Sequence, residues 1–161
     1  MRFRAFPKPF QAALEHYVSM GGNIFISGAY VGTDLFENRV DSLDIEFAEQ
    51  VLKYRHRTDH AVNTGKVISS DSTLFTLPEG FEFNTLVHPK LYAVESPDAI
   101  EPVDTTASTV LRYAENNTSA AVAHSGDSKI MVFGFPFETI ISQTHRDEVM
   151  KSILEFFLRK D

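Results

Sequence analysis

The sequence contains no cysteine and no tryptophan, and it has no long apolar run. Without cysteine there is no disulfide, no thiolate nucleophile and no cysteine-ligated metal. The longest uninterrupted apolar stretches are a few residues long, whereas a membrane-spanning helix needs about 20. We therefore expect no membrane span and no chemistry that depends on a cysteine.

Positive charge is also scarce, since 15 Lys and Arg stand against 22 Asp and Glu, for a net charge of −7. One basic cluster stands out, formed by Lys53, Arg55, His56 and Arg57. It follows a predicted helix, where cations interact favourably with the helix dipole. A polyanion site is the alternative interpretation, but nucleic-acid binding needs a wider basic surface. We expect the cluster to end a helix, and we expect no nucleic-acid partner.

What the sequence does contain is typical of one globular domain. Its 161 residues include 43% hydrophobic side chains and 14 Phe, enough to bury a core. We therefore treat residues 1–161 as a single α/β domain. A helix pattern begins almost at once, although an α/β domain normally opens with a strand. We expect the chain to be a fragment or C-terminal module of a larger protein, with a short edge strand over Arg2–Phe6 as the alternative.

The spacing of apolar residues predicts three helices. The first begins at Pro7 and Pro9 and ends at Gly21-Gly22, and the second begins near Asp41 or Ser42. The closing helix is predicted to be capped by Thr144 with Asp147. Its expected inward stripe is Val149, Met150, Ile153, Leu154 and Phe157.

Short apolar runs and period-two alternation predict the strands. Ile24–Ser27 has the composition of a buried strand. The other predicted strands are Lys66–Ser69, Thr73–Leu77, Phe81–Thr85, Leu91–Glu95, Thr109–Ala114, Ala120–His124 and Lys129–Phe133. The last three are expected to form a meander, and Ile24–Ser27 is expected to lie parallel to Lys129–Phe133. This order predicts a mostly parallel sheet with helices on both faces and an antiparallel meander extension.

The glycine-rich turn after the first strand is the first candidate site, because ligands of open α/β sheets bind at the carboxyl ends of strands. Gly28-Ala29-Tyr30-Val31-Gly32 has the glycine spacing of a nucleophile elbow. Its central Tyr30 is a poor acyl nucleophile, because the ordinary pKa of tyrosine is about 10. We expect a structural turn here. Gly28, Tyr30, Gly32 and Asp34 are its candidate ligand-binding residues.

Glu138, which follows the last strand, is the second candidate. It is expected near the same edge of the sheet, where it could orient a base or bind a substrate hydroxyl; a solvated carboxylate on an apolar loop is the alternative. A triad of Ser27, His124 and Glu138 can be proposed, although nothing in the spacing requires it. Tyr30, Glu138 and His124 are thus the catalytic candidates.

The sequence offers little that could bind a metal. The six histidines form no His-x-His or His-Glu-x-x-His pair. His56 and His60 are four residues apart but are expected to straddle a helix end. Asp98, Glu101 and Asp104 could chelate calcium, yet their loop lacks the glycine and closing glutamate of an EF-hand. We expect solvated loop charge, no metal and no cofactor.

Two segments carry a resemblance to a known family. Residues 13–30 resemble the helix and strand that lead to the nucleophile of class I glutamine-amidotransferase-like domains, whose fold is flavodoxin-like. Residues 132–140 resemble the last strand and loop of those domains. The family uses a Gly-x-Cys-x-Gly elbow and a late His-Pro-Glu loop. Here Tyr30 stands at the place of the cysteine and Phe135 at that of the histidine, so the resemblance implies the fold without glutaminase activity.

Four shorter segments resemble a narrower group. Residues 27–34, 94–100, 112–117 and 134–138 are similar to C-terminal modules of exported proteins of Bacteroides-type bacteria that are often labelled xanthan lyase. The resemblance implies a non-catalytic accessory module in a larger periplasmic or extracellular protein associated with polysaccharide or the cell envelope. Its partners would be neighbouring domains of the parent chain, with carbohydrate as a further candidate. The alternative is a hydrolase or polysaccharide-lyase module that uses Tyr30 and Glu138 at the sheet edge.

Overall fold

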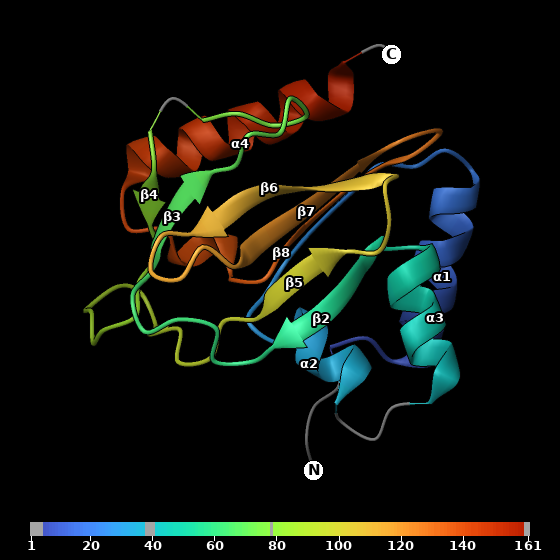
Figure 1. Cartoon of the computed structure of the whole chain (residues 1–161), viewed down its shortest axis with the longest axis horizontal. Helices are drawn as coiled ribbons and strands as arrows, with labels where there is room; N and C mark the ends of the chain where they lie inside the picture. The colour runs from blue at the N-terminus through green and yellow to red at the C-terminus, as the bar shows by residue number, and fades with distance from the viewer. Residues whose placement is uncertain (1–4, 38–40, 78, 160–161) are drawn as a thin grey trace.

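The computed structural model describes residues 5–37, 41–77 and 79–159. It is a mixed α/β fold with a six-stranded sheet in the order β1-β8-β7-β6-β3-β4, beside a two-stranded sheet of β2 and β5 (Figure 1). The helices are α1 (Lys8–Ser19), α2 (Val31–Phe36), α3 (Ser42–Gln50), the 3-10 helix η1 (Phe137–Thr139) and α4 (Gln143–Leu158). The strands are β1 (Ile24–Ser27), β2 (Tyr54–Thr58), β3 (Lys66–Ser69), β4 (Phe81–Glu82), β5 (Ala99–Pro102), β6 (Ala107–Tyr113), β7 (Ser119–Ser125) and β8 (Lys129–Phe133).

The parallel pairing of β1 with β8 is confirmed, from Ile24 opposite Ile130 to Ser27 opposite Phe133. The meander of β6, β7 and β8 is confirmed too. The other strand pairs of this sheet, β3 with β4, β3 with β6, β6 with β7 and β7 with β8, are antiparallel, however. A parallel neighbour needs a crossover of about a dozen residues, whereas β6, β7 and β8 follow one another through short turns. The expected flavodoxin-like, mostly parallel sheet is therefore wrong, and the sheet is mixed and mostly antiparallel.

Each face of the sheet carries its own hydrophobic core. Along β8, Met131 and Phe133 point into one core, whereas Ile130 and Val132 point into the other. This alternation follows from the period of two along a strand. Helix α4 packs on the first core, and α1, α2 and α3 contribute to the second (Figure 1). The strand ends at which ligands were expected therefore lie between two helix layers.

The closing helix α4 buries only part of its predicted inward stripe, since Val149 and Ile153 are buried as predicted. Its buried residues are Val149, Ile153 and Phe156, at the helical spacing i, i+4, i+7. Leu154 is 51% exposed, so the expectation that it packs on the sheet is wrong. The N-cap is Ser142, whose hydroxyl accepts a hydrogen bond from the His145 amide, rather than Thr144.

Helix α3 begins as expected, with a capping box between Asp41 and Asp44. The basic cluster does not end it, because the helix stops at Gln50 and Lys53 adopts a positive φ of 66°. The rest of the cluster lies on β2, a strand that was not predicted because its residues are mostly charged. Its cations form exposed ion pairs there, such as Arg57 Nη1 with Glu101 Oε1 at 3.0 Å.

The other differences concern irregular segments. Thr73–Leu77 and Leu91–Glu95 are not strands, and of Phe81–Thr85 only the first two residues are. Strand β5, which pairs with β2, falls in the segment expected to be a loop. The alternative edge strand over Arg2–Phe6 lies largely outside the described residues. No helix in the described part of the chain is long and apolar enough to cross a membrane, as expected.

Candidate functional site

The turn after β1 holds no strained elbow. Gly28 continues the strand, since its amide donates to the Phe133 carbonyl at 3.3 Å. Tyr30 has an unstrained φ of −124° and is the N-terminal flanking residue of α2. Its side chain is 54% exposed. Tyr30 therefore faces solvent at this edge of the sheet and does not line an enclosed pocket.

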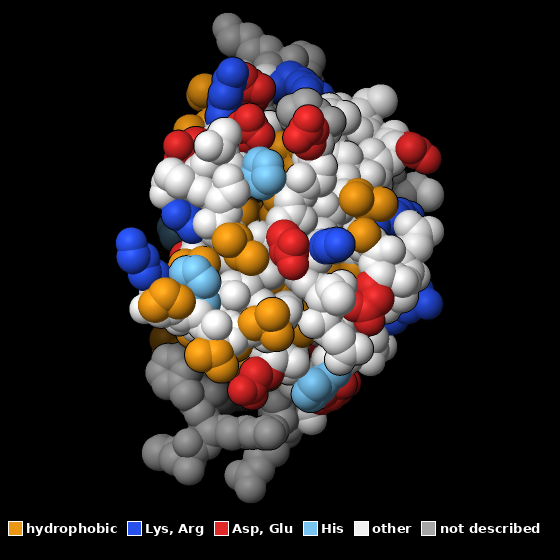
Figure 2. Space-filling model, turned by 90° about the vertical axis from the view of Figure 1, so that its left-hand side faces the viewer, with side chains coloured by type: hydrophobic (Ala, Val, Ile, Leu, Met, Phe, Trp, Pro, Cys, Tyr) orange, Lys and Arg blue, Asp and Glu red, His pale blue; other side chains and the backbone are white. Residues whose placement is uncertain are grey.

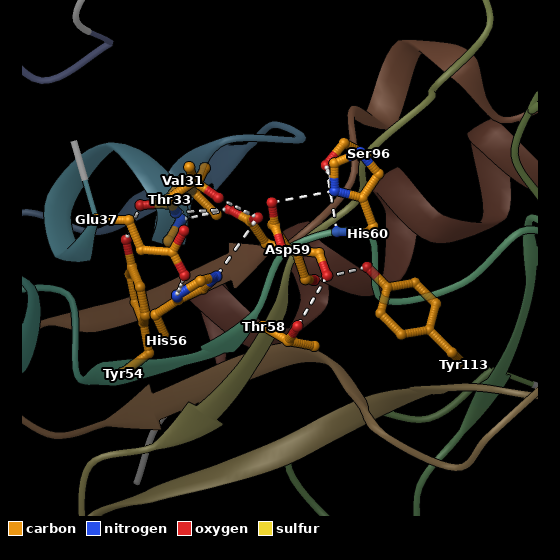
Figure 3. A network of polar contacts seen from close by, with 12 residues as sticks. Val31, Thr33, Glu37, Tyr54, His56, Thr58, Asp59, His60, Ser96 and Tyr113 are labelled. Atoms are coloured by element: carbon orange, nitrogen blue, oxygen red, sulfur yellow. Dashed lines mark hydrogen bonds and ion pairs between the residues drawn. The ribbon is translucent and has the colours of Figure 1, made fainter.

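The amides that follow this turn are occupied by a carboxylate of the chain itself (Figure 3). Oδ2 of Asp98 accepts hydrogen bonds from the amides of Gly32 at 2.7 Å and Thr33 at 3.0 Å. Oδ1 accepts a third from the Thr33 hydroxyl at 2.8 Å. Amides at the start of a helix form a favourable position for an anion. Asp98, which is completely buried, fills it.

The backbone of Asp98 is held as firmly as its side chain. Its amide donates to the Gly134 carbonyl at 2.8 Å, and its carbonyl accepts from the Tyr113 hydroxyl at 2.8 Å. A side chain at position 134 would not fit, because its Cβ would lie 2.0 Å from the Asp98 carbonyl oxygen. The carboxylate is thus fixed by strands β6 and β8 as well as by α2.

His56 lies next to this carboxylate. Its side chain is 4% exposed, with Nε2 3.6 Å from Oδ1 of Asp98 and Nδ1 3.2 Å from Oε1 of Glu37. Nε2 makes no hydrogen bond to the described residues. Burial alone would lower the pKa of His56, but Asp98, Glu37 and Asp59 outweigh it and raise this pKa above the ordinary value. The pair is a buried ion pair when His56 is protonated.

A second group in Figure 3 contains a serine, a histidine and an aspartate. Ser96 Oγ and Asp59 Oδ2 each lie 3.0 Å from the same atom, Nδ1 of His60. A catalytic relay needs the serine on one ring nitrogen and the carboxylate on the other. Ser96 is also buried, at 2% exposure. This group therefore lacks the geometry of a triad, and it anchors the loop before β5.

Glu138 lies near the same edge, in η1. Its Oε1 accepts a hydrogen bond from the Tyr92 hydroxyl at 2.8 Å. The Phe137 amide donates to Ser27 Oγ at 3.2 Å, which joins η1 to the end of β1. Sequence reasoning missed Tyr92, because it belongs to an irregular segment that was expected to be a strand.

His124 lies away from Ser27 and Glu138. It is paired with Ile130 at the start of β8, whereas Ser27 is paired with Phe133 at its end. Three residues of strand separate these positions by about 10 Å. Nδ1 of His124 instead lies 2.6 Å from the Thr106 carbonyl oxygen. The structure thus keeps the proposed triad of Ser27, His124 and Glu138 apart.

The remaining candidates have internal partners. Oδ2 of Asp34 accepts from the Phe6 amide at 3.0 Å, and a Cβ at position 32 would lie 2.3 Å from the His56 ring. Phe135 is completely buried and stacks on Phe83, with ring centroids 4.8 Å apart. It belongs to the core and leaves no space for a base.

No group of three or more possible metal ligands occurs in the described ranges. Asp98 is engaged with α2, Glu101 with Arg57, and Asp104 Oδ1 with the Thr106 amide. The interpretation of Asp98 as solvated loop charge is wrong, because the residue is completely buried. One sequence signal could have suggested this: Asp98 directly precedes the apolar pair Ala99-Ile100, which are both buried in β5.

Comparisons with known proteins bear on the fold. No protein-family model matches the chain, and a search of curated proteins gave no significant match. Among solved structures, the chain is similar to the exo-β-1,4-mannosidase Op5Man5 from Opitutaceae bacterium strain TAV5, with a TM-score of 0.55 and 14% identity. The match covers 96% of this chain and 24% of that one, so the chain spans about a quarter of the mannosidase.

The match and the mixed sheet together correct the resemblance drawn from the sequence. The assignment to flavodoxin-like, amidotransferase-like modules is wrong, and the narrower link to Bacteroides-type exported proteins labelled xanthan lyase has no support. At 14% identity the likeness to the mannosidase concerns the fold alone.

Proposed function

We propose that this domain is a non-catalytic accessory module of a larger carbohydrate-active protein, in which it binds a ligand or packs against a neighbouring domain. The observation that carries this proposal is the position of Asp98. The amides of Gly32 and Thr33, which would otherwise be free to hold an anionic substrate or a developing oxyanion, are bonded to its carboxylate.

The structural similarity to part of a mannosidase supports the proposal that this domain belongs to a larger protein. The matched segment is about a quarter of that chain, which is the proportion expected of one domain among several. Because that protein is an exo-β-1,4-mannosidase, a carbohydrate context is the natural proposal for this domain too.

The alternative, a hydrolase or lyase that uses Tyr30 and Glu138, has weaker support. The tyrosine whose hydroxyl donates to Glu138 is Tyr92 rather than Tyr30, so the two proposed catalytic residues are not the pair that the structure brings together. Glu138 alone would contribute about 10²–10⁴-fold as a general acid or base, well below the roughly 10⁶-fold of an enzyme.

The test is an activity assay of the purified 161-residue chain on β-1,4-mannan oligosaccharides, simple esters and glutamine. Tyr30→Phe, Glu138→Gln and the control Tyr17→Phe are assayed beside it. We expect the same background rate for all four proteins. Turnover by the wild type and Tyr17→Phe that both other substitutions abolish would replace the accessory module with an enzyme.

A further inference from the structure

Tyr92 and Glu138 form a fixed pair of an aromatic ring and a carboxylate at the surface. The Tyr92 hydroxyl donates to Oε1 of Glu138 at 2.8 Å, and Tyr92 is 55% exposed. Within residues 5–37, 41–77 and 79–159, the second oxygen, Oε2, accepts no hydrogen bond and forms no ion pair. The Tyr92 ring and Oε2 of Glu138 are therefore both available to a ligand from solvent.

One buried residue sets the relative position of this pair. The Asn84 side-chain amide donates to the carbonyls of Leu86 at 2.7 Å and Tyr92 at 3.0 Å. The backbone amide of Asn84 donates to the Thr139 carbonyl, next to Glu138, at 2.8 Å. Because Asn84 is tied to both segments, the pair is held in place before any ligand arrives, which lowers the entropic cost of binding.

Further apolar groups lie around the pair. The loop of residues 84–92, at the left of Figure 1, contains Leu86 and Val87, which are both exposed. Figure 2 views that side, where hydrophobic side chains stand among acidic and histidine side chains. Tyr30, 54% exposed, follows the strand whose Ser27 bonds to η1, so a second ring belongs to the same edge.

We propose that this edge binds a neutral oligosaccharide, with the Tyr92 ring against the C–H face of one sugar and Oε2 of Glu138 accepting from its hydroxyls. An aromatic face packs on an apolar surface, and an ionised carboxylate only accepts hydrogen bonds. A sugar presents both an apolar face and hydroxyl donors. An acidic glycan is disfavoured, because Glu138 and the net charge of −7 repel it. This inference rests on the proposed function and names its ligand class.

Protonation supports the arrangement. Burial and the hydrogen bond to Glu138 raise the pKa of Tyr92 well above its ordinary value. The hydroxyl therefore keeps its proton at neutral pH and continues to orient the carboxylate. Oε1 remains occupied, and Oε2 remains the acceptor available to a ligand.

The test titrates the isotope-labelled chain with cellohexaose, β-1,4-mannohexaose and a galacturonic-acid hexamer, followed by amide ¹H–¹⁵N spectra. We expect at least one neutral hexasaccharide to shift the amides of Tyr92, Glu138 and their neighbours, and the acidic hexamer to shift none of them. Tyr92→Ala should weaken the binding about tenfold. Tyr92→Phe, which keeps the ring, should weaken it less.

Tyr17→Ala is the matched control, since Tyr17 is 52% exposed on α1. It should leave binding unchanged. No shift with either neutral hexasaccharide at millimolar concentration, or equal losses from Tyr92→Ala and Tyr17→Ala, would overturn the inference. The accessory role would then stand as domain packing, whereas turnover of a hexasaccharide during the titration would overturn the proposed function itself.

Discussion

His56 and Asp98 face each other inside the molecule, with Nε2 of the imidazole 3.6 Å from Oδ1 of the carboxylate. The histidine comes from β2 and the aspartate from the residue before β5, the strand that pairs with β2. The carboxylate also binds the first amides of α2. Asp98 thereby joins the two-stranded sheet to the first turn of α2.

The buried pair predicts a pH-dependent stability. The folded pKa of His56 is raised above its unfolded value of about 6.5. The protonated histidine therefore contributes its full stabilisation below pH 6.5, and the contribution is lost as the pH rises through the folded pKa. Urea unfolding from pH 6 upward should show a free energy of unfolding that falls by at most about 1.4 kcal/mol per pH unit across this window.

Two substitutions test whether His56 causes this fall in the free energy of unfolding with pH. His56→Gln should remove most of the fall, whereas His16→Gln, on the exposed surface of α1, should keep it. A wild-type stability that is constant or rises across the same window would show that His56 is not held as a cation.

Asp98→Ala should be strongly destabilising. It removes the acceptor of three hydrogen bonds and leaves the donors of Gly32 and Thr33 buried beside His56. We expect a loss of about 3–5 kcal/mol in urea unfolding, as for breaking a buried ion pair. Glu101→Ala, which breaks only a partly exposed pair with Arg57, should cost at most about 1 kcal/mol. Similar losses from both substitutions would contradict the role given to Asp98.

Adjacent residues of α4 should differ sharply in their effect on stability. Ile153 is 1% exposed in the core, so Ile153→Ala should cost about 2–5 kcal/mol. Leu154 is 51% exposed, and Leu154→Ala should change stability by no more than about 0.5 kcal/mol. The two free energies come from urea unfolding, and the reverse order would mean that the helix is docked through another face.

The sequence predicts the central strands well, because their signal is local. β1 and β8 are short apolar runs between turn residues, and both have the predicted bounds. β2 escapes prediction because Arg55, His56 and Arg57 give it the composition of a solvated segment. β5 escapes because it ends in Pro102, which suits an edge strand and breaks the usual strand pattern.

The candidate site is predicted only in part, because its decisive contacts join distant residues. Tyr30 and Glu138 follow neighbouring strands, so their shared edge can be inferred from topology. The bonds of Asp98 to Gly32 and Thr33 span more than sixty residues, and no local pattern reports them. The face of α4 is predicted in part: Val149 and Ile153 are buried as predicted, whereas Leu154 is exposed and Phe156 is buried instead. The periplasmic or extracellular location of a parent protein stays a prediction.

Whether Asp98 occupies the amides of Gly32 and Thr33 in solution can be measured by hydrogen exchange. Amide exchange of these two residues should be slow in the wild type and unaffected by added sulfate, because the carboxylate already accepts both hydrogen bonds. In Asp98→Asn the same amides should exchange faster. Rapid exchange in the wild type that is slowed by sulfate would show that the amides are open to an anionic ligand and would contradict the non-catalytic role.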